Sequence, residues 1–180
     1  MAEGGDVSDA PPYSRAQFGD GWADLDADGC NTRNEILARD LTDLDFESDA
    51  RACVVQGGIL EDPYTDTTIV FQRGEQTSAA VQIDHVVALA NGWRSGAWQW
   101  NAEDRLRFAN DPLNLLAVEG AANQIKGAST ADQWLPDNKG YRCDYAARQV
   151  AVKYKWNLTV TRDEQQALNR VLKDCPSITF

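Results

Sequence analysis

The chain has 180 residues, 43% of them hydrophobic, which is enough for one globular domain with its own core. Its formal net charge of −11 argues against a stable nucleic-acid scaffold, because proteins that hold a duplex through its phosphates carry a basic surface. The charge does not exclude a hydrolase, which needs only a local basic strip or a metal ion at the scissile group. No apolar run approaches the roughly 20 residues that a membrane span requires.

In chain order, residues 1–12 are expected to form a flexible N-terminal arm ahead of one domain at residues 13–180. Met1–Asp9 is small, polar and acidic and does not match a signal peptide, so we interpret it as an added start on a mature chain or as a natural arm. A short element from Arg15 to Trp22 leads into an acidic loop, and the apolar spacing after it predicts a helix from Arg33 to Leu44.

The next segment predicts β-strands. β-branched and aromatic runs at Cys53–Val55 and Thr67–Phe71 are separated by the turn residues Gly57–Gly58 and Asp62–Pro63. A further strand is predicted from Ala80 to His85.

Beyond that strand the helical period returns. Apolar residues recur at this spacing at Val86, Leu89, Ala90, Trp93 and Ala97. The turn Asn110–Asn114 leads into a predicted strand at Leu115–Val118 and a short helix at Glu119–Lys126, which Gly127 ends. Two amphipathic helices, Tyr145–Lys153 and Arg162–Lys173, complete the expected α+β domain.

The four cysteines predict two disulfides and therefore an extracellular location. None of them forms a CxxC pair, so a zinc ribbon is not indicated. Cys30–Cys53 and Cys143–Cys175 are the favoured pairs because each closes a loop of moderate length, although the two other pairings and four reduced core cysteines stay open.

The sole histidine, His85, is the natural candidate for a general base. It stands where a strand is expected to end, directly after Asp84. A neutral imidazole with a pKa near 6.5 can take a proton from water at neutral pH. The alternative is a structural histidine, and the residues around His85 distinguish the two roles.

Five sequence segments resemble the HNH nucleases of the His-Me finger (ββα-metal) superfamily, and within it the secreted GmrSD-type branch. They read DHVVALANGWRSGAW, FANDPLNLLAV, AANQIKG, WLP and YRCDYA, in this order. The upstream DADGCNTRNEIL and DPYT segments are also similar, so the resemblance covers roughly residues 18–175. It implies a ββα core at about residues 79–127, with additional helices around it.

The resemblance also implies the catalytic residues. His85 would be the general base that deprotonates the attacking water, and Asn114 would orient its imidazole by a hydrogen bond. Asp84 and Asn123 would ligate one divalent cation, Mg²⁺ or Mn²⁺ rather than Zn²⁺ because their donors are oxygens. The third HNH position is Asn123 here instead of a histidine, which also favours a hard metal.

Alternatives to these roles remain at each position. On a regular strand Asp84 and His85 point to opposite faces, so both serve one site only if the strand ends there. Asp84 could instead pair with an arginine, Asn114 could be a turn residue, and Asn123 could face solvent. The candidate phosphate contacts, each with ordinary surface charge as the alternative, are Arg33, Lys126, Arg94, Arg105 and Arg107.

The acidic loop is a second candidate site. It matches the EF-hand pattern D-x-D-x-D-G-x₅-E at every specified position, with its carboxylates at Asp24, Asp26, Asp28 and Glu35. The sequence therefore predicts a possible Ca²⁺ site, with a solvated or Arg33-paired acidic turn as the alternative.

Two functions are consistent with the sequence as a whole. The first is a secreted, monomeric, metal-dependent endonuclease of low sequence specificity that hydrolyses DNA and possibly RNA, with no membrane partner. The second is a catalytically inactive, calcium-binding extracellular interaction module. Hydrolysis of another polyanion is a further alternative.

Overall fold

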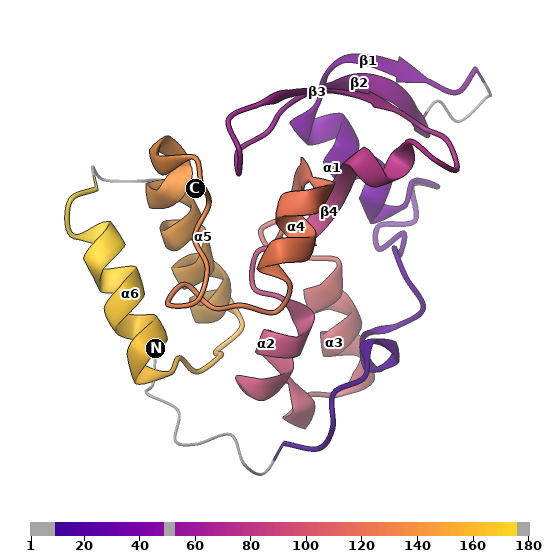
Figure 1. Ribbon diagram of the computed structural model, residues 1–180. Helices are drawn as coiled ribbons and strands as arrows, with labels where there is room; N and C mark the ends of the chain where they lie inside the picture. The colour runs from indigo at the N-terminus through magenta and orange to yellow at the C-terminus, as the bar shows by residue number, and fades with distance from the viewer. Residues whose placement is uncertain (1–9, 49–52, 176–180) are drawn as a thin grey trace.

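The computed structural model, which describes residues 10–48 and 53–175, combines six helices with two small β-sheets, and the larger sheet lies at one edge of the molecule (Figure 1). Most of the arm expected at residues 1–12 lies outside these ranges. The helices are α1 (Thr32–Asp40), α2 (Leu89–Arg94), α3 (Ala102–Ala109), α4 (Gly120–Lys126), α5 (Arg142–Lys155) and α6 (Arg162–Leu172), with short 3-10 turns η1 (Arg15–Phe18), η2 (Ser78–Ala80), η3 (Ala97–Gln99) and η4 (Lys139–Tyr141). No helix in the described ranges has the length and apolar character needed to cross a membrane.

Both sheets are antiparallel. The larger contains β1 (Thr42–Phe46), β2 (Val55–Glu61) and β3 (Thr68–Gln72) in sequential order. The smaller pairs β4 (Val81–His85) with β5 (Leu115–Glu119). The predicted α+β class is confirmed.

The predicted helix from Arg33 to Leu44 is wrong in its second half. α1 ends at Asp40, and the chain turns into β1, whose Thr42 pairs with Ile59 of β2. The alternation of Thr42, Leu44 and Phe46 with aspartates suits a strand, and β2 supplies the backbone partners that a local pattern does not reveal.

The glycines predicted as a turn lie inside a strand instead. Gly57 and Gly58 are in β2 and pair with Gln72 and Phe71 of β3. A Cβ on Gly58 would lie 3.0 Å from the Leu41 side chain and 3.1 Å from the carbonyl oxygen of the next residue. The glycine is therefore required by the close approach of the chain that enters β1, not by a reversal of direction.

The β4, β5 and α4 segments form a ββα unit, with α2 and α3 inserted between its strands. α4 follows β5 directly, and Gly120 lets its first turn approach η2, because a Cβ there would lie 2.1 Å from the Ala79 carbonyl oxygen. Glu119 caps the helix by accepting from the Ala122 N–H, and Gly127, at φ 51°, ends it as predicted.

α1 packs between the two sheets and fixes the ββα unit to the rest of the fold (Figure 1). Its Ile36 and Leu37 are buried against side chains of both sheets. A second core gathers aromatic side chains of η1, α2 and α3, including Phe18, Trp93 and Phe108. A third core packs Leu116 and Val118 of β5 and Ala122 of α4 against Tyr64 and Tyr145, so β5 contributes alternate residues to this core and to the α1 core.

The disulfides join the pairs favoured from the sequence. Cys30–Cys53 links the segment before α1 to the start of the larger sheet, and Cys143–Cys175 ties α5 to the end of α6. The second bond closes 32 residues and contributes about 4 kcal/mol if its effect is loop closure in the unfolded chain.

Candidate functional site

Asn114 fixes the course of the chain directly after His85. Its carbonyl oxygen accepts from Val86 N–H at 2.8 Å. Its side-chain Oδ1 accepts from Val87 N–H at 2.8 Å, and its Nδ2 donates to the Val87 carbonyl at 3.2 Å. The predicted hydrogen bond from Asn114 to the imidazole is therefore wrong, because both polar groups of this fully buried amide match the Val87 peptide. Asn114 acts on His85 through the backbone.

The His85 imidazole is held by a carbonyl and an indole. Its Nε2 lies 2.8 Å from the Ala109 carbonyl oxygen. A carbonyl can only accept, so Nε2 carries the hydrogen and Nδ1 is the basic nitrogen. The Trp22 ring stacks on the imidazole, with centroids 5.6 Å apart and planes 8° from parallel.

Burial keeps this imidazole neutral. The side chain is only 7% exposed. Burial lowers the pKa of His85 from 6.5 to about 4, against the opposing effect of the Ala109 hydrogen bond. At neutral pH the residue is therefore in the form that can accept a proton.

The Asp84 carboxylate points away from Trp22 and into a buried polar cluster. Tyr64 Oη donates to Asp84 Oδ2 at 2.5 Å, and Lys126 Nζ donates to Oδ1 at 2.9 Å. Lys126 Nζ also donates to the His85 carbonyl oxygen at 2.9 Å. Burial and the Asp84 charge raise the pKa of Tyr64 well above 10, so its hydroxyl stays a donor. The sequence analysis considered a pairing of Asp84 with an arginine as the alternative to a metal ligand. Asp84 does have a cationic partner, but this partner is Lys126.

The buried cluster changes the role of Lys126. Its side chain is 0% exposed and paired with Asp84, so it is not placed to contact a phosphate as the sequence suggested. Lys126 instead joins the end of α4 to the end of β4.

Asp84, His85 and Asn123 nevertheless line one cleft of about 320 Å³. Asn123 on α4 donates from Nδ2 to Gln82 Oε1 at 2.8 Å, which orients its amide at the wall of the cleft. The side chains of Asp84 and His85 have different partners, as a strand requires, but the strand ends at His85 and both residues reach the cleft.

Asp84 and Asn123 are the residues of this cleft that could hold one hard divalent cation. A carboxylate offers about four acceptor positions, of which Tyr64 and Lys126 occupy two on Asp84. The carboxylate of Asp84 and the amide oxygen of Asn123 are the kind of ligand that Mg²⁺ or Mn²⁺ takes together with water.

The arginines expected at the cleft lie elsewhere. Arg33 is half-buried and donates to the Val81 carbonyl at 3.4 Å, at the opposite end of β4 from His85. Arg94 lines a neighbouring cleft of about 610 Å³ and donates to the Ala128 carbonyl at 3.3 Å. Arg105 donates to the carbonyls of Gln17 and Trp100, and Arg107 pairs with Glu103, so both are engaged within the fold.

Sequence reasoning missed two residues beside His85, Trp22 and Arg15. Both precede it by more than 60 residues, and no local pattern connects them to β4. Arg15 lines the 320 Å³ cleft and also a smaller hollow, which Trp22 and His85 line as well.

Trp22 owes its position to the residue that follows it. Ala23 N–H donates to Asn110 Oδ1 at 2.9 Å, and its carbonyl accepts from Thr32 Oγ1 at 2.7 Å. Asn110 comes directly after Ala109, so the indole and the carbonyl that hold the imidazole are joined to each other.

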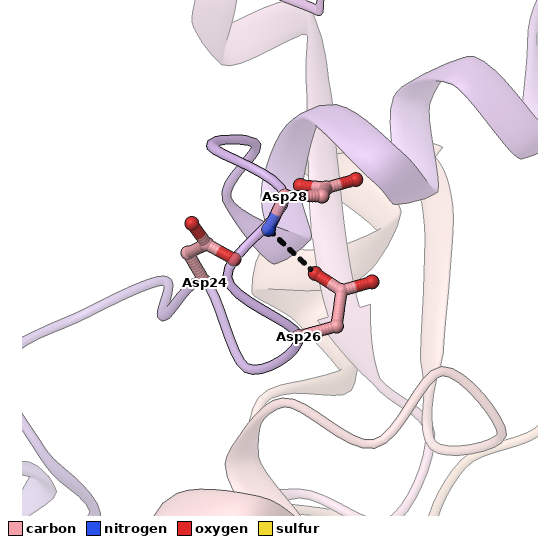
Figure 2. A group of neighbouring side chains, drawn as sticks. All are labelled: Asp24, Asp26 and Asp28. Carbon is pink, nitrogen blue, oxygen red and sulfur yellow. Dashed lines mark hydrogen bonds between the residues drawn. The ribbon is translucent and has the colours of Figure 1, made fainter.

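The acidic loop gathers three of the four carboxylates of the EF-hand pattern. One oxygen from each of Asp24, Asp26 and Asp28 lies within 4.8 Å of the others, and all three side chains are exposed (Figure 2). Asp24 Oδ2 accepts from Gly29 N–H at 2.9 Å, and Gly29 has φ 94°. Burial, followed by the charges of the three aspartates, raises the pKa of Glu35, which places the fourth carboxylate near them.

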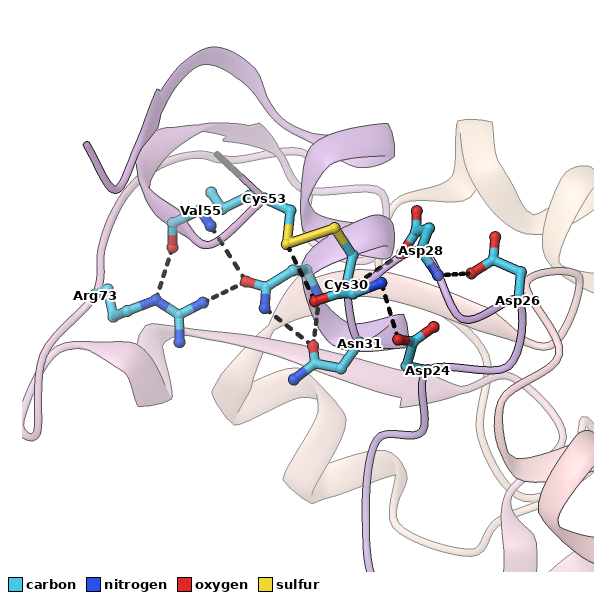
Figure 3. The surroundings of a disulfide bond; sticks show 10 residues. Asp24, Asp26, Asp28, Cys30, Asn31, Cys53, Val55 and Arg73 are labelled. Carbon is cyan, nitrogen blue, oxygen red and sulfur yellow. Dashed lines mark hydrogen bonds between the residues drawn. A yellow bond between two sulfur atoms is a disulfide. The ribbon is translucent and has the colours of Figure 1, made fainter. Parts of the chain in front are cut away.

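The loop is anchored where it enters α1. Asn31 caps the helix by accepting from Asn34 N–H, and Cys30 is bonded to Cys53 (Figure 3). Beside the disulfide, Arg73 Nε donates to the Val55 carbonyl at 2.7 Å. Arg33 is directed to Val81, so the Arg33-paired acidic turn considered from the sequence is not the arrangement present.

The fold and the cleft together define a disulfide-linked α+β domain whose ββα unit presents a neutral histidine beside a carboxylate and an amide. The model of the C-terminal domain of GmrSD restriction endonucleases matches residues 31–171, and the chain belongs to this family of nuclease-type domains.

A relative extends the likeness beyond that domain. The chain is 36% identical over 165 residues to an uncharacterized secreted protein of Arthroderma benhamiae, covering 91% of this chain and 76% of the relative. No solved structure matches the chain with significance.

Proposed function

We propose that this protein is a secreted, metal-dependent endonuclease of the HNH type that hydrolyses phosphodiester bonds of DNA, and possibly RNA, with low sequence specificity. One observation carries the proposal: the neutral imidazole of His85, with Nε2 tied to the Ala109 carbonyl, opens into the same cleft as Asp84 and Asn123. The two disulfides and the secreted relative support an extracellular location.

In this proposal His85 activates the nucleophile. Its Nδ1 takes a proton from water, the water oxygen bonds to phosphorus, and the bond from phosphorus to the 3′ oxygen breaks. The Ala109 carbonyl stabilises the imidazolium that forms, because it already accepts the Nε2 hydrogen. Asp84 and Asn123 would hold one Mg²⁺ or Mn²⁺ ion, which would offset charge on the phosphate and stabilise the leaving oxygen.

Low sequence specificity follows from the same features. The end of β4, the start of α2, α4 and the segment around Arg15 line the cleft, and none of these elements in the described part of the chain resembles a module that enters a groove and reads base edges. With a net charge of −11, binding would depend on local cations and the bound metal, and not on a broad basic surface.

Plasmid digestion tests the proposal directly. The wild type should relax and linearise plasmid DNA with Mg²⁺ or Mn²⁺ and stop when EDTA is added. The variant His85→Asn, which keeps a polar side chain in the stacked position, should lose at least the 10²- to 10⁴-fold that a general base contributes. If the wild type leaves DNA and RNA intact with every divalent ion tried, the nuclease proposal fails.

Two further variants test the metal ligands separately from the base. Asn123→Ala should raise the Mn²⁺ concentration for half-maximal cleavage by roughly tenfold or more, while Gln124→Ala, one residue along the same cleft wall, serves as the matched control. An unchanged metal requirement in Asn123→Ala would remove this residue from the ligand set.

We also propose that the acidic loop binds Ca²⁺, since the loop brings three aspartates together beside the turn glycine that an EF-hand loop needs, and Glu35 stands at the twelfth position of the pattern. Calorimetry should detect Ca²⁺ binding and a raised melting temperature in the wild type, and Glu35→Gln should weaken both. Asp43→Asn, an exposed aspartate of β1, is the control. No heat and no shift in melting temperature would remove the site. If Ca²⁺ binds but no substrate is cleaved, the interaction-module alternative is favoured.

A further inference from the structure

The cleft that holds His85 contains one basic side chain that could meet a phosphate. Among the residues that line it, Arg15 is the only arginine or lysine. Lys126, the other cation near His85, is fully buried and paired with Asp84. A chain with a net charge of −11 needs a positive group where the phosphodiester enters, and the cleft offers this one.

We propose that Arg15 binds the scissile phosphate directly, as the guanidinium that orients it toward His85. This inference rests on the proposed nuclease function. Arg15 lines both hollows that contain His85, the 320 Å³ cleft and the smaller one that Trp22 borders, and its side chain is exposed, so a phosphate that enters the cleft would meet it.

The backbone around Arg15 is rigidly anchored although its side chain is exposed. Phe18, in the same 3-10 turn, is 2% exposed and packs on Trp93 and Phe108 with centroids 6.0 Å apart in each pair. On the other side of Arg15, the Pro11 carbonyl accepts from Trp93 Nε1 at 2.7 Å. An anchored backbone places the guanidinium at the cleft before substrate arrives, so little ordering is needed on binding.

A third contact supports the 3-10 turn η1, which carries Arg15. Arg105 Nε donates to the Gln17 carbonyl at 2.8 Å, and its guanidinium lies 5.7 Å from the centre of the Trp93 ring. The arginine that the sequence suggested for phosphate binding therefore supports the turn that carries Arg15.

The charge of Arg15 is available and close to the proposed base. Within residues 10–48 and 53–175, Arg15 takes part in no ion pair. It lines the same cleft and the same smaller hollow as His85. A guanidinium presents a planar set of donors that matches two phosphate oxygens at once, which a lysine ammonium does not.

The test compares two substrates that differ in how many phosphates they carry. Plasmid DNA has many phosphodiesters, whereas bis(p-nitrophenyl) phosphate has only the one that is hydrolysed. Arg15→Ala should lower kcat/KM by roughly 10²- to 10³-fold on both, the loss typical of removing one group that stabilises the transition state, and Arg15→Lys should recover part of it. Arg170→Ala, which removes the same charge from the exposed end of α6, is the control and should match the wild type.

Each other outcome overturns the inference. If Arg15→Ala cleaves both substrates within twofold of Arg170→Ala, Arg15 does not contact the phosphate, and the nuclease function stands. If the loss appears on plasmid alone and vanishes as salt is raised, Arg15 only attracts the polyanion. An inactive wild type overturns the proposed function itself. The melting temperature of Arg15→Ala should stay close to that of the wild type because the side chain is exposed, which separates loss of contact from loss of fold.

Discussion

Replacing Lys126 with methionine would leave the Asp84 carboxylate buried without its cation. Asp84 is 4% exposed and Lys126 0%, and their atoms lie 2.9 Å apart. Removing one partner of such a pair costs about 3–5 kcal/mol, because the remaining charge cannot recover its hydration. The His85 carbonyl oxygen would also lose a donor. For a chain of this size, 1 kcal/mol corresponds to roughly 2–4 °C, so the melting temperature should fall by about 6–20 °C.

Urea unfolding at pH 7 with the disulfides intact measures this loss. The control is Arg107→Met, because Arg107 pairs with Glu103 at 2.6 Å but both side chains are exposed, at 59% and 70%, and its removal should cost at most about 1 kcal/mol. The double variant Asp84→Asn/Lys126→Met has no buried charge and should be more stable than Lys126→Met alone, with a coupling of about 2 kcal/mol or more. A loss below about 1 kcal/mol in Lys126→Met would refute the buried ion pair.

Two further predictions concern His85 and its support. The unfolded imidazole binds a proton below about pH 6.5 and the folded one only near pH 4, so the free energy of unfolding should fall as the pH drops through this window, by about 3 kcal/mol in total. His85→Gln should lack this component, and equal pH slopes in urea unfolding of the two proteins would contradict the lowered pKa. Asn114→Ala should cost roughly 1–3 kcal/mol because the buried Val87 peptide loses its partners. It should also slow cleavage by displacing the chain after His85, and a stable Asn114→Ala protein with full activity would show that the backbone contact does not position the base.

Local patterns were sufficient where neighbouring residues decide the structure. The strand that ends at His85, the helix that ends at Gly127 and the helix from Arg162 each follow from a residue period with its stop signals, and each lies close to its predicted bounds. The preferred cysteine pairs were correct because short loops close at low entropic cost. α3 was missed although Asn101 caps it and acidic residues begin it.

Local patterns failed where a distant segment supplies the partner. Thr42 to Phe46 extends a helical pattern but pairs with β2, and Gly57–Gly58 looks like a turn but lies inside a strand. In both cases backbone hydrogen bonds from another strand outweigh the small differences in intrinsic propensity.

The sequence by itself determined the order of the ββα elements, the acidic loop and the residues His85, Asp84 and Asn123 as candidates, and it favoured the two disulfide pairs without excluding others. The tertiary structure alone decided their partners. Lys126 meets Asp84 from 42 residues away, Ala109 holds the imidazole from 24 residues away, and Arg15 reaches the cleft from the other end of the domain. Such contacts depend on how elements far apart in the sequence pack against the ββα unit. Because charges and hydrogen bonds act through space, no local stretch of the chain reveals these partners.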